Sequence, residues 1–152
     1  MKLAFFDVDG VLSIPSYDVD GRVCAGGSME WWLRANAESY SYELCRCPKA
    51  VKKFLKDRAA EGVKLFVLST EDIPSARENK KRFVKENYGK LFCDESMIFT
   101  QSDAEKIYVL KKYAEKENIP FEEVYYLDDT YSMVLTACEF GFDAHHVSEF
   151  LE

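Results

Sequence analysis

The chain has 152 residues, of which 47% are hydrophobic and 31% are charged. This length matches one ordinary domain, and the balance of apolar and charged residues excludes a disordered chain. We therefore expect a single globular domain over residues 1–152. The formal net charge of -7 argues against a general nucleic-acid or acidic-membrane binder, because such proteins usually carry net positive surface.

Short continuous apolar runs predict strands that are buried on both faces of a sheet. Three such runs occur at Leu3–Phe6, Val63–Leu68 and Val124–Leu127, and two weaker signals occur at Met97–Phe99 and Phe142–Val147. Amphipathic patterns between them predict helices at Pro48–Glu61, Ser75–Asn87, Ala104–Asn118 and Ser132–Phe140. Alternating strands and helices predict an α/β fold with a mainly parallel sheet covered by helices on both faces.

Residues 13–47 interrupt this alternation and form a small insertion after the first strand. Within it, Ile14–Ala25 has the pattern of a hairpin, and Ser28–Glu43 is compatible with a helix. Trp31 and Trp32 in the helical part have two interpretations: they stack on a base or an aromatic leaving group, or they pack the insertion onto the domain, which we favour.

The tetrapeptide DVDG occurs twice, and its surroundings differ. The first copy follows a buried strand, so Asp7 and Asp9 emerge at the carboxyl end of that strand, where open parallel sheets place their sites. The second copy, Asp18–Gly21, has no buried strand before it and suits a turn. We therefore assign chemistry to Asp7 and Asp9 and a turn to the second copy.

Polar residues follow two other predicted strands at Ser69–Thr70 and Asp128–Asp129. Two unit charges about 4 Å apart interact by about 4 kcal/mol at an effective dielectric near 20, so a cluster of Asp7 with the two later aspartates demands a cation. Oxygen ligands without thiolate or imidazole favour Mg²⁺. A phosphate on that ion would also need an attacking group, a proton donor and donors to its oxygens.

The donors to phosphate are expected in Ser69, Thr70 and Lys106. Ser102 and Glu105 have the spacing of a capping box, which predicts a helix start just before Lys106. A cation in that first turn faces the positive end of the helix dipole, which suggests another task for this lysine. The alternative interpretation of Lys106 is an ordinary solvated side chain.

Four motifs in this order resemble the haloacid dehalogenase superfamily, specifically its aspartate-dependent phosphatases: DVDGV at Asp7–Val11, LST at Leu68–Thr70, Lys106 opening a helix, and YYLDDT at Tyr125–Thr130. The resemblance covers Met1 to about Phe150 and implies a three-layer, Rossmann-like fold. It implies that Asp7 is the nucleophile of an aspartyl-phosphate and that Asp9 protonates the leaving group and then activates water.

The resemblance also implies that Ser69 and Lys106 hold the phosphoryl oxygens. Magnesium would be held by Asp7, Asp128, Asp129 and the backbone carbonyl of Asp9. Two features depart from the family pattern: Leu127 stands where many members have glycine, and the insertion is too small to be a large cap. The small insertion favours a bulky substrate, a cap completed by an oligomer, or the short aromatic segment as a lid. A phosphomutase needs an enclosed site to keep water from the intermediate, so we expect hydrolysis.

Residues Arg77–Lys85 form a net positive stretch that could bind the substrate. The segments ST..P and KKRFVKENYG in this region loosely resemble 5′-nucleotidases of the same superfamily, which suggests a nucleotide substrate. The favoured alternative is a solvated helix face. Two other functions stay open: a phosphoacceptor domain, whose usual order of acidic pair and lysine is the reverse of the order here, and a binding module that retains the site without efficient turnover. His145 and His146 are given no role.

The cysteines are odd in number and scattered, which suits reduced thiols in a cytoplasmic protein: Cys24, Cys45, Cys47, Cys93 and Cys138. Cys45 and Cys47 could form half of a zinc site, but no second pair has matching spacing, so we favour structural thiols. The apolar run before Asp7 is too short for a signal peptide or a membrane span.

Overall fold

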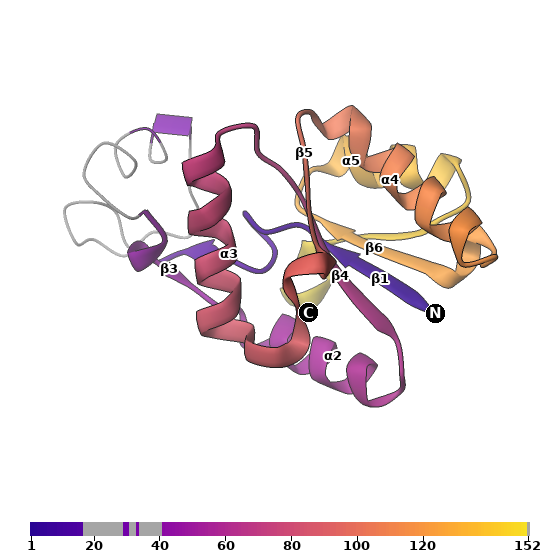
Figure 1. The fold of residues 1–152 in the computed structure, drawn as a ribbon, viewed down its shortest axis with the longest axis horizontal. Coiled ribbons are helices and arrows are strands. Elements are labelled where there is room, and N and C mark those ends of the chain that lie inside the picture. The colour runs from indigo at the N-terminus through magenta and orange to yellow at the C-terminus, as the bar shows by residue number, and fades with distance from the viewer. Residues whose placement is uncertain (17–28, 31–32, 34–40, 152) are drawn as a thin grey trace.

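The computed structural model describes residues 1–16, 29–30, 33 and 41–151. Its central sheet has five parallel strands in the order β5-β4-β1-β6-β7 (Figure 1). The strands are β1 Leu3–Phe6, β4 Lys64–Thr70, β5 Met97–Thr100, β6 Val124–Asp128 and β7 Asp143–His146. The helices are α2 Lys49–Ala60, α3 Pro74–Tyr88, α4 Asp103–Lys116 and α5 Tyr131–Glu139. This arrangement confirms the predicted three-layer α/β fold.

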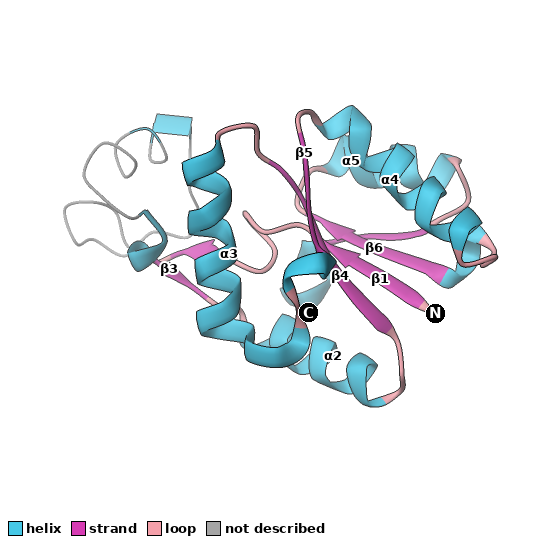
Figure 2. Ribbon diagram, viewed as in Figure 1, coloured by secondary structure: helices cyan, strands magenta, loops and turns pink. Residues whose placement is uncertain are grey.

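Side chains along each strand alternate between the two faces of the sheet, as the pleat of a strand requires. Leu3 and Phe5 of β1 belong to a core with α4 and α5, whereas Ala4 and Phe6 belong to a core with α2 and α3. Figure 2 shows the two helix pairs on opposite sides of the sheet. The alternation along a strand therefore also fixes the side of the sheet on which a polar residue just after the strand lies.

β1 lies at the centre of the sheet, between β4 and β6. Its last residue, Phe6, is aligned with Val67 of β4 and with Leu127 of β6. The chain runs outward from β1 through β4 and β5 and then returns to the other side through β6 and β7. Open α/β sheets bind ligands at the carboxyl ends of the strands where this reversal occurs.

The ends of the insertion are joined by a two-stranded antiparallel sheet of β2 Ile14–Pro15 and β3 Cys45–Arg46. We did not predict this pairing, because strands of two residues carry no periodic signal. The partner strand of the predicted hairpin, its Asp18–Gly21 turn, and the predicted roles of Trp31, Trp32 and Cys24 lie outside the described residues. At the end of the predicted 28–43 helix, Ser41–Leu44 forms the 3-10 helix η1.

The remaining short elements are 3-10 helices: η2 Gly89–Leu91, η3 Asp94–Ser96, η4 Phe121–Glu123 and η5 Val147–Leu151. α4 begins after Ser102, as predicted, but the capping box is not formed. The Ser102 side chain makes no cap hydrogen bond, and the Glu105 carboxylate accepts instead from the backbone N–H of Gln101 at 3.0 Å. Within the described residues, no helix has both the length and the apolarity needed to cross a bilayer.

Candidate active site

The first DVDG forms a tight turn directly after β1. The backbone N–H of Leu12 donates to the Asp7 carbonyl at 3.3 Å, and that of Ser13 donates to the Val8 carbonyl at 2.8 Å. Gly10 has a φ of +81°, and a Cβ at this position would lie 2.1 Å from the Asp129 carboxylate oxygen Oδ2. The glycine is therefore required both for the backbone conformation and for the close approach of Asp129.

Gly10→Ala should weaken Mg²⁺ binding as well as stability. Left-handed backbone strain alone costs roughly 1–2 kcal/mol for a non-glycine residue, and here the new methyl group also displaces Asp129. Gly62→Ala is the matched control, because Gly62 has a φ of +84° and a Cβ added there would meet nothing within 4 Å. Calorimetric titration should show Mg²⁺ affinity lowered on the order of tenfold or more in Gly10→Ala alone. Equal affinities in the two variants would contradict the close approach.

Asp7 and Asp128 lie on the face of the sheet that α4 covers, because Asp7 is two residues beyond Phe5, and Asp128 is two residues beyond Tyr126. Lys106 of α4 lies between them. Its Nζ donates to Asp7 Oδ2 at 2.8 Å and to Asp128 Oδ2 at 2.9 Å. The Lys106 side chain is 1% exposed, so these charges interact with little screening by solvent.

The carboxylates of Asp7, Asp128 and Asp129 each offer an oxygen within 4.8 Å of the other two. In the described part of the chain, this is the only cluster of three or more His, Cys, Asp or Glu side chains close enough to hold a metal ion. The Asp9 carboxylate is not part of this cluster. The metal-ligand role of the Asp9 backbone carbonyl stays a prediction.

The charges of this cluster shift several pKa values. Burial raises the pKa of Asp7, an effect that the Lys106 ammonium opposes and the Asp128 carboxylate reinforces. Burial lowers the pKa of Lys106, but the carboxylates of Asp7 and Asp128 more than offset this and raise it above the ordinary value. Partial burial, together with Asp7 and Asp128, raises the pKa of Asp129 to about 7. One ammonium does not balance three carboxylates.

Metal-free protein should lose stability as the pH rises from 3.8, the ordinary pKa of an aspartate, to about 7, because folded Asp129 binds its proton more tightly than the unfolded chain does. Asp129→Asn removes this loss, so its melting temperature should exceed that of the wild type by a margin that grows across this window. Added Mg²⁺ should reverse the order. Glu95→Gln, at an exposed carboxylate of η3, is the control. A margin independent of pH would contradict the shift.

Other groups hold Asp128 and Asp129 in place, and none of these contacts was predicted from the sequence. The Tyr126 hydroxyl donates to Asp128 Oδ2, and the backbone N–H of Thr130 donates to Asp128 Oδ1 at 2.7 Å. His146 Nε2 lies 2.9 Å from the Asp129 carbonyl oxygen. Tyr126 could have been found, since residues i and i+2 of a strand share a face.

Ser69 and Thr70 end β4 on opposite faces of the sheet. The Thr70 hydroxyl donates to Asp103 Oδ1 at 2.6 Å and lies 3.1 Å from the Thr100 hydroxyl. The Ser69 hydroxyl accepts a hydrogen bond at 3.1 Å from Lys80 of α3. Two of the predicted phosphate-binding residues therefore contact different helices: Ser69 contacts Lys80 of α3, and Thr70 contacts Asp103 at the start of α4.

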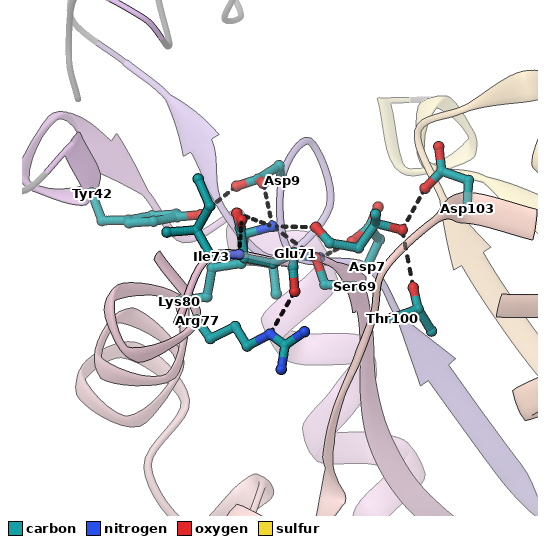
Figure 3. A network of polar contacts seen from close by, with 12 residues as sticks. Asp7, Asp9, Tyr42, Ser69, Glu71, Ile73, Arg77, Lys80, Thr100 and Asp103 are labelled. Atoms are coloured by element: carbon teal, nitrogen blue, oxygen red, sulfur yellow. Dashed lines mark hydrogen bonds and ion pairs between the residues drawn. The ribbon is translucent and has the colours of Figure 1, made fainter. Parts of the chain in front are cut away.

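The interpretation of Arg77–Lys85 as a solvated face is wrong for Lys80, which is buried at the centre of a polar network (Figure 3). Its Nζ lies 2.9 Å from Asp9 Oδ2. For Arg82 and Lys85, which are exposed, the interpretation holds. Ion pairs join Arg82 to Glu86 at 2.8 Å and Lys85 to Asp94 at 2.6 Å, and the half-buried Lys81 is paired with Glu78 at 3.2 Å.

No protein-family model matches the sequence, and a search of curated proteins finds no match. Solved structures do match. A haloacid dehalogenase-like hydrolase from Streptococcus pneumoniae aligns with a TM-score of 0.61 at 15% identity, covering 95% of this chain and 83% of its own. The N-terminal part of a Bacteroides fragilis protein, which contains a phosphatase domain and was crystallised with Mg, aligns with a TM-score of 0.61 at 15% identity.

That alignment covers 99% of this chain and 39% of the Bacteroides chain, so the chain spans well under two thirds of that neighbour. The cobalt-bound deoxy-D-mannose-octulosonate 8-phosphate phosphatase from Haemophilus influenzae aligns with a TM-score of 0.51 at 15% identity, covering 96% of this chain and 68% of its own. The chain therefore has the fold of the haloacid dehalogenase-like hydrolases, as its motifs predicted.

Proposed function

We propose that the protein is a Mg²⁺-dependent phosphohydrolase that cleaves a phosphomonoester through an aspartyl-phosphate on Asp7. The observation that carries the proposal is the buried contact of Asp7 with Lys106, in a cluster with Asp128 and Asp129 at the switch-point edge of the sheet. The fold, which is shared with phosphatases, supports the same reaction class.

The residues of the cluster fit a magnesium ion. All of their donor atoms are carboxylate oxygens, the ligands that this hard cation prefers. Burial raises the pKa values of Asp7 and Asp129, and neighbouring carboxylates raise them further, so a bound cation would favour the charged forms of both residues. Asp7, Asp128 and Asp129 would hold the ion. When bound, it would neutralise charge on the phosphoryl oxygens and on Asp7.

In the proposed first step, a carboxylate oxygen of Asp7 attacks phosphorus, the bond to the leaving oxygen breaks, and Asp9 gives that oxygen a proton. Lys106 and Ser69 would hold the peripheral oxygens of the phosphoryl group, where charge is concentrated in the transition state. In the second step, Asp9 takes a proton from water as the water attacks phosphorus. Inorganic phosphate leaves and free Asp7 is restored.

The proposed substrate is a nucleotide or another bulky phosphorylated molecule. A substrate panel is needed to choose between them, because the basic side chains of α3 that favoured a nucleotide are paired with carboxylates of the chain itself.

We also propose that residues 1–152 form one domain, that the protein is cytoplasmic with reduced thiols, and that an oligomer could complete the site. Cys47, Cys93 and Cys138 are free thiols.

The test is hydrolysis of p-nitrophenyl phosphate by the purified protein, with Mg²⁺ and after chelation. Turnover that depends on Mg²⁺ is expected, and a panel of nucleotides and sugar phosphates would then define the substrate. Two results would contradict the proposal. Stable phosphorylation without release of phosphate would indicate a phosphoacceptor, and binding of Mg²⁺ and beryllofluoride without turnover would indicate a binding module.

A further inference from the structure

Lys80 is the second buried lysine at the carboxyl edge of the sheet, and the steps proposed above do not use it. It is 4% exposed, and its Nζ lies within 3.1 Å of three oxygen atoms: Asp9 Oδ2 at 2.9 Å, the Thr70 carbonyl at 3.0 Å and the Ser69 hydroxyl at 3.1 Å. The Glu71 carboxylate is farther away, at 3.6 Å. Two of these partners, Asp9 and Ser69, are side chains of the proposed reaction.

Asp9 is held through both carboxylate oxygens. Oδ2 is paired with Lys80, and Oδ1 accepts a hydrogen bond at 2.7 Å from the hydroxyl of Tyr42 (Figure 3). Tyr42 is buried and packs its ring against Phe83 of α3, with ring centroids 5.3 Å apart. The helix that carries Lys80 therefore also supports the second partner of Asp9.

Apolar packing alone does not account for a charged residue at position 80. Lys80 lies three and four residues before the buried Phe83 and Val84, on the face of α3 that packs against the sheet. An apolar side chain there would avoid the desolvation penalty of a buried ammonium. The ammonium instead connects Ser69 of β4 with Asp9 of the turn after β1.

We propose that Lys80 is a positioning residue, with Tyr42 as its second anchor, that fixes the Asp9 side chain for its two proton transfers: to the leaving oxygen as a carboxylic acid, and from water as a carboxylate. This inference rests on the proposed phosphatase function. General acids act only within hydrogen-bond reach of their target, and a displacement of about 1 Å can lower a rate by on the order of a hundredfold. Because Lys80 donates to the Ser69 oxygen, the Ser69 proton stays available for a phosphoryl oxygen.

The dependence of rate on the leaving group separates this role from a structural one. Phenyl phosphate and p-nitrophenyl phosphate have similar shapes, but phenolate is the poorer leaving group and needs the acid more. Lys80→Met should lower kcat/KM for phenyl phosphate about tenfold more than for p-nitrophenyl phosphate. Tyr42→Phe, which keeps the packed ring, should cause a smaller loss with the same preference. Lys81→Met, at a neighbour paired with Glu78, should change neither rate.

Asp9→Asn provides the second readout. If Lys80 acts through Asp9, adding Lys80→Met to Asp9→Asn should produce no further loss that depends on the leaving group. Equal losses on both substrates in Lys80→Met and in Tyr42→Phe would overturn the inference and leave the phosphatase function standing. If Lys80→Met does not fold, Tyr42→Phe decides the question in the same way. Failure of the wild type to hydrolyse either substrate with Mg²⁺ would instead refute the function on which the inference rests.

Discussion

Asp7→Asn should abolish turnover of p-nitrophenyl phosphate in the presence of Mg²⁺, with kcat lowered by about a thousandfold or more. An amide is too weak a nucleophile to form the covalent intermediate, and it offers one neutral oxygen where the carboxylate offers two charged ones. Steady-state assays of the two proteins at equal concentration measure the effect. Activity within tenfold of the wild type would contradict the assignment of Asp7.

The stability of Asp7→Asn is the control for folding. Because burial and Asp128 raise the pKa of Asp7, the charged form is disfavoured in the folded, metal-free protein. A neutral amide avoids the cost of burying a charge, which outweighs the lost attraction to Lys106, and Lys106 keeps its contact with Asp128 at 2.9 Å, so the melting temperature without metal should not fall. A large fall would mean that any loss of activity reports misfolding, and the role of Asp7 would need another test.

Lys106→Met should cause the largest loss of stability among the variants considered, as well as a loss of activity. It leaves Asp7 and Asp128 without the ammonium that contacts both of them at 2.8 and 2.9 Å. Breaking a buried ion pair by removing one partner typically costs about 3–5 kcal/mol, which corresponds to roughly 10 °C in the melting temperature of a chain of this size. Thermal unfolding in metal-free buffer measures the loss.

Magnesium should restore part of that stability, because a cation bound by Asp7 and Asp128 replaces some of the missing charge. Lys112→Met, at an exposed lysine of the same helix, is the matched control and should behave like the wild type. If Lys106→Met unfolds at the same temperature as Lys112→Met, the ammonium of Lys106 does not balance the carboxylates in the way the contacts indicate.

Much of the fold follows from the sequence because the central strands β1 and β6 are buried on both faces. Continuous apolar runs such as Val124–Leu127 predict the strands within one or two residues, and strand alternation then brings Asp7 and Asp128 to the face where α4 supplies Lys106. The main error in a strand boundary was at β4, which continues through Ser69 and Thr70, so that both residues are held by the sheet.

The network around Asp9 was not predicted, for two different reasons. Lys80 lies in a run of charged residues that hides its place on the buried face of α3, although its spacing from Phe83 and Val84 carries that signal. Tyr42 lies at the end of the insertion, where the β2–β3 pairing rather than any periodicity brings the chain back to the site. Contacts of this kind depend on tertiary structure that local patterns do not encode.

The measurement that tests the central claim most directly is detection of the phosphoryl-enzyme. Asp9→Asn lacks the base for the second step and should accumulate the intermediate with p-nitrophenyl phosphate, whose leaving group needs little acid. After acid quench and proteolysis, mass spectrometry should find one phosphoryl group on the peptide that carries Asp7. Release of p-nitrophenol in amounts above the enzyme concentration with that peptide unmodified, or a phosphoryl group on another residue, would contradict nucleophilic catalysis by Asp7.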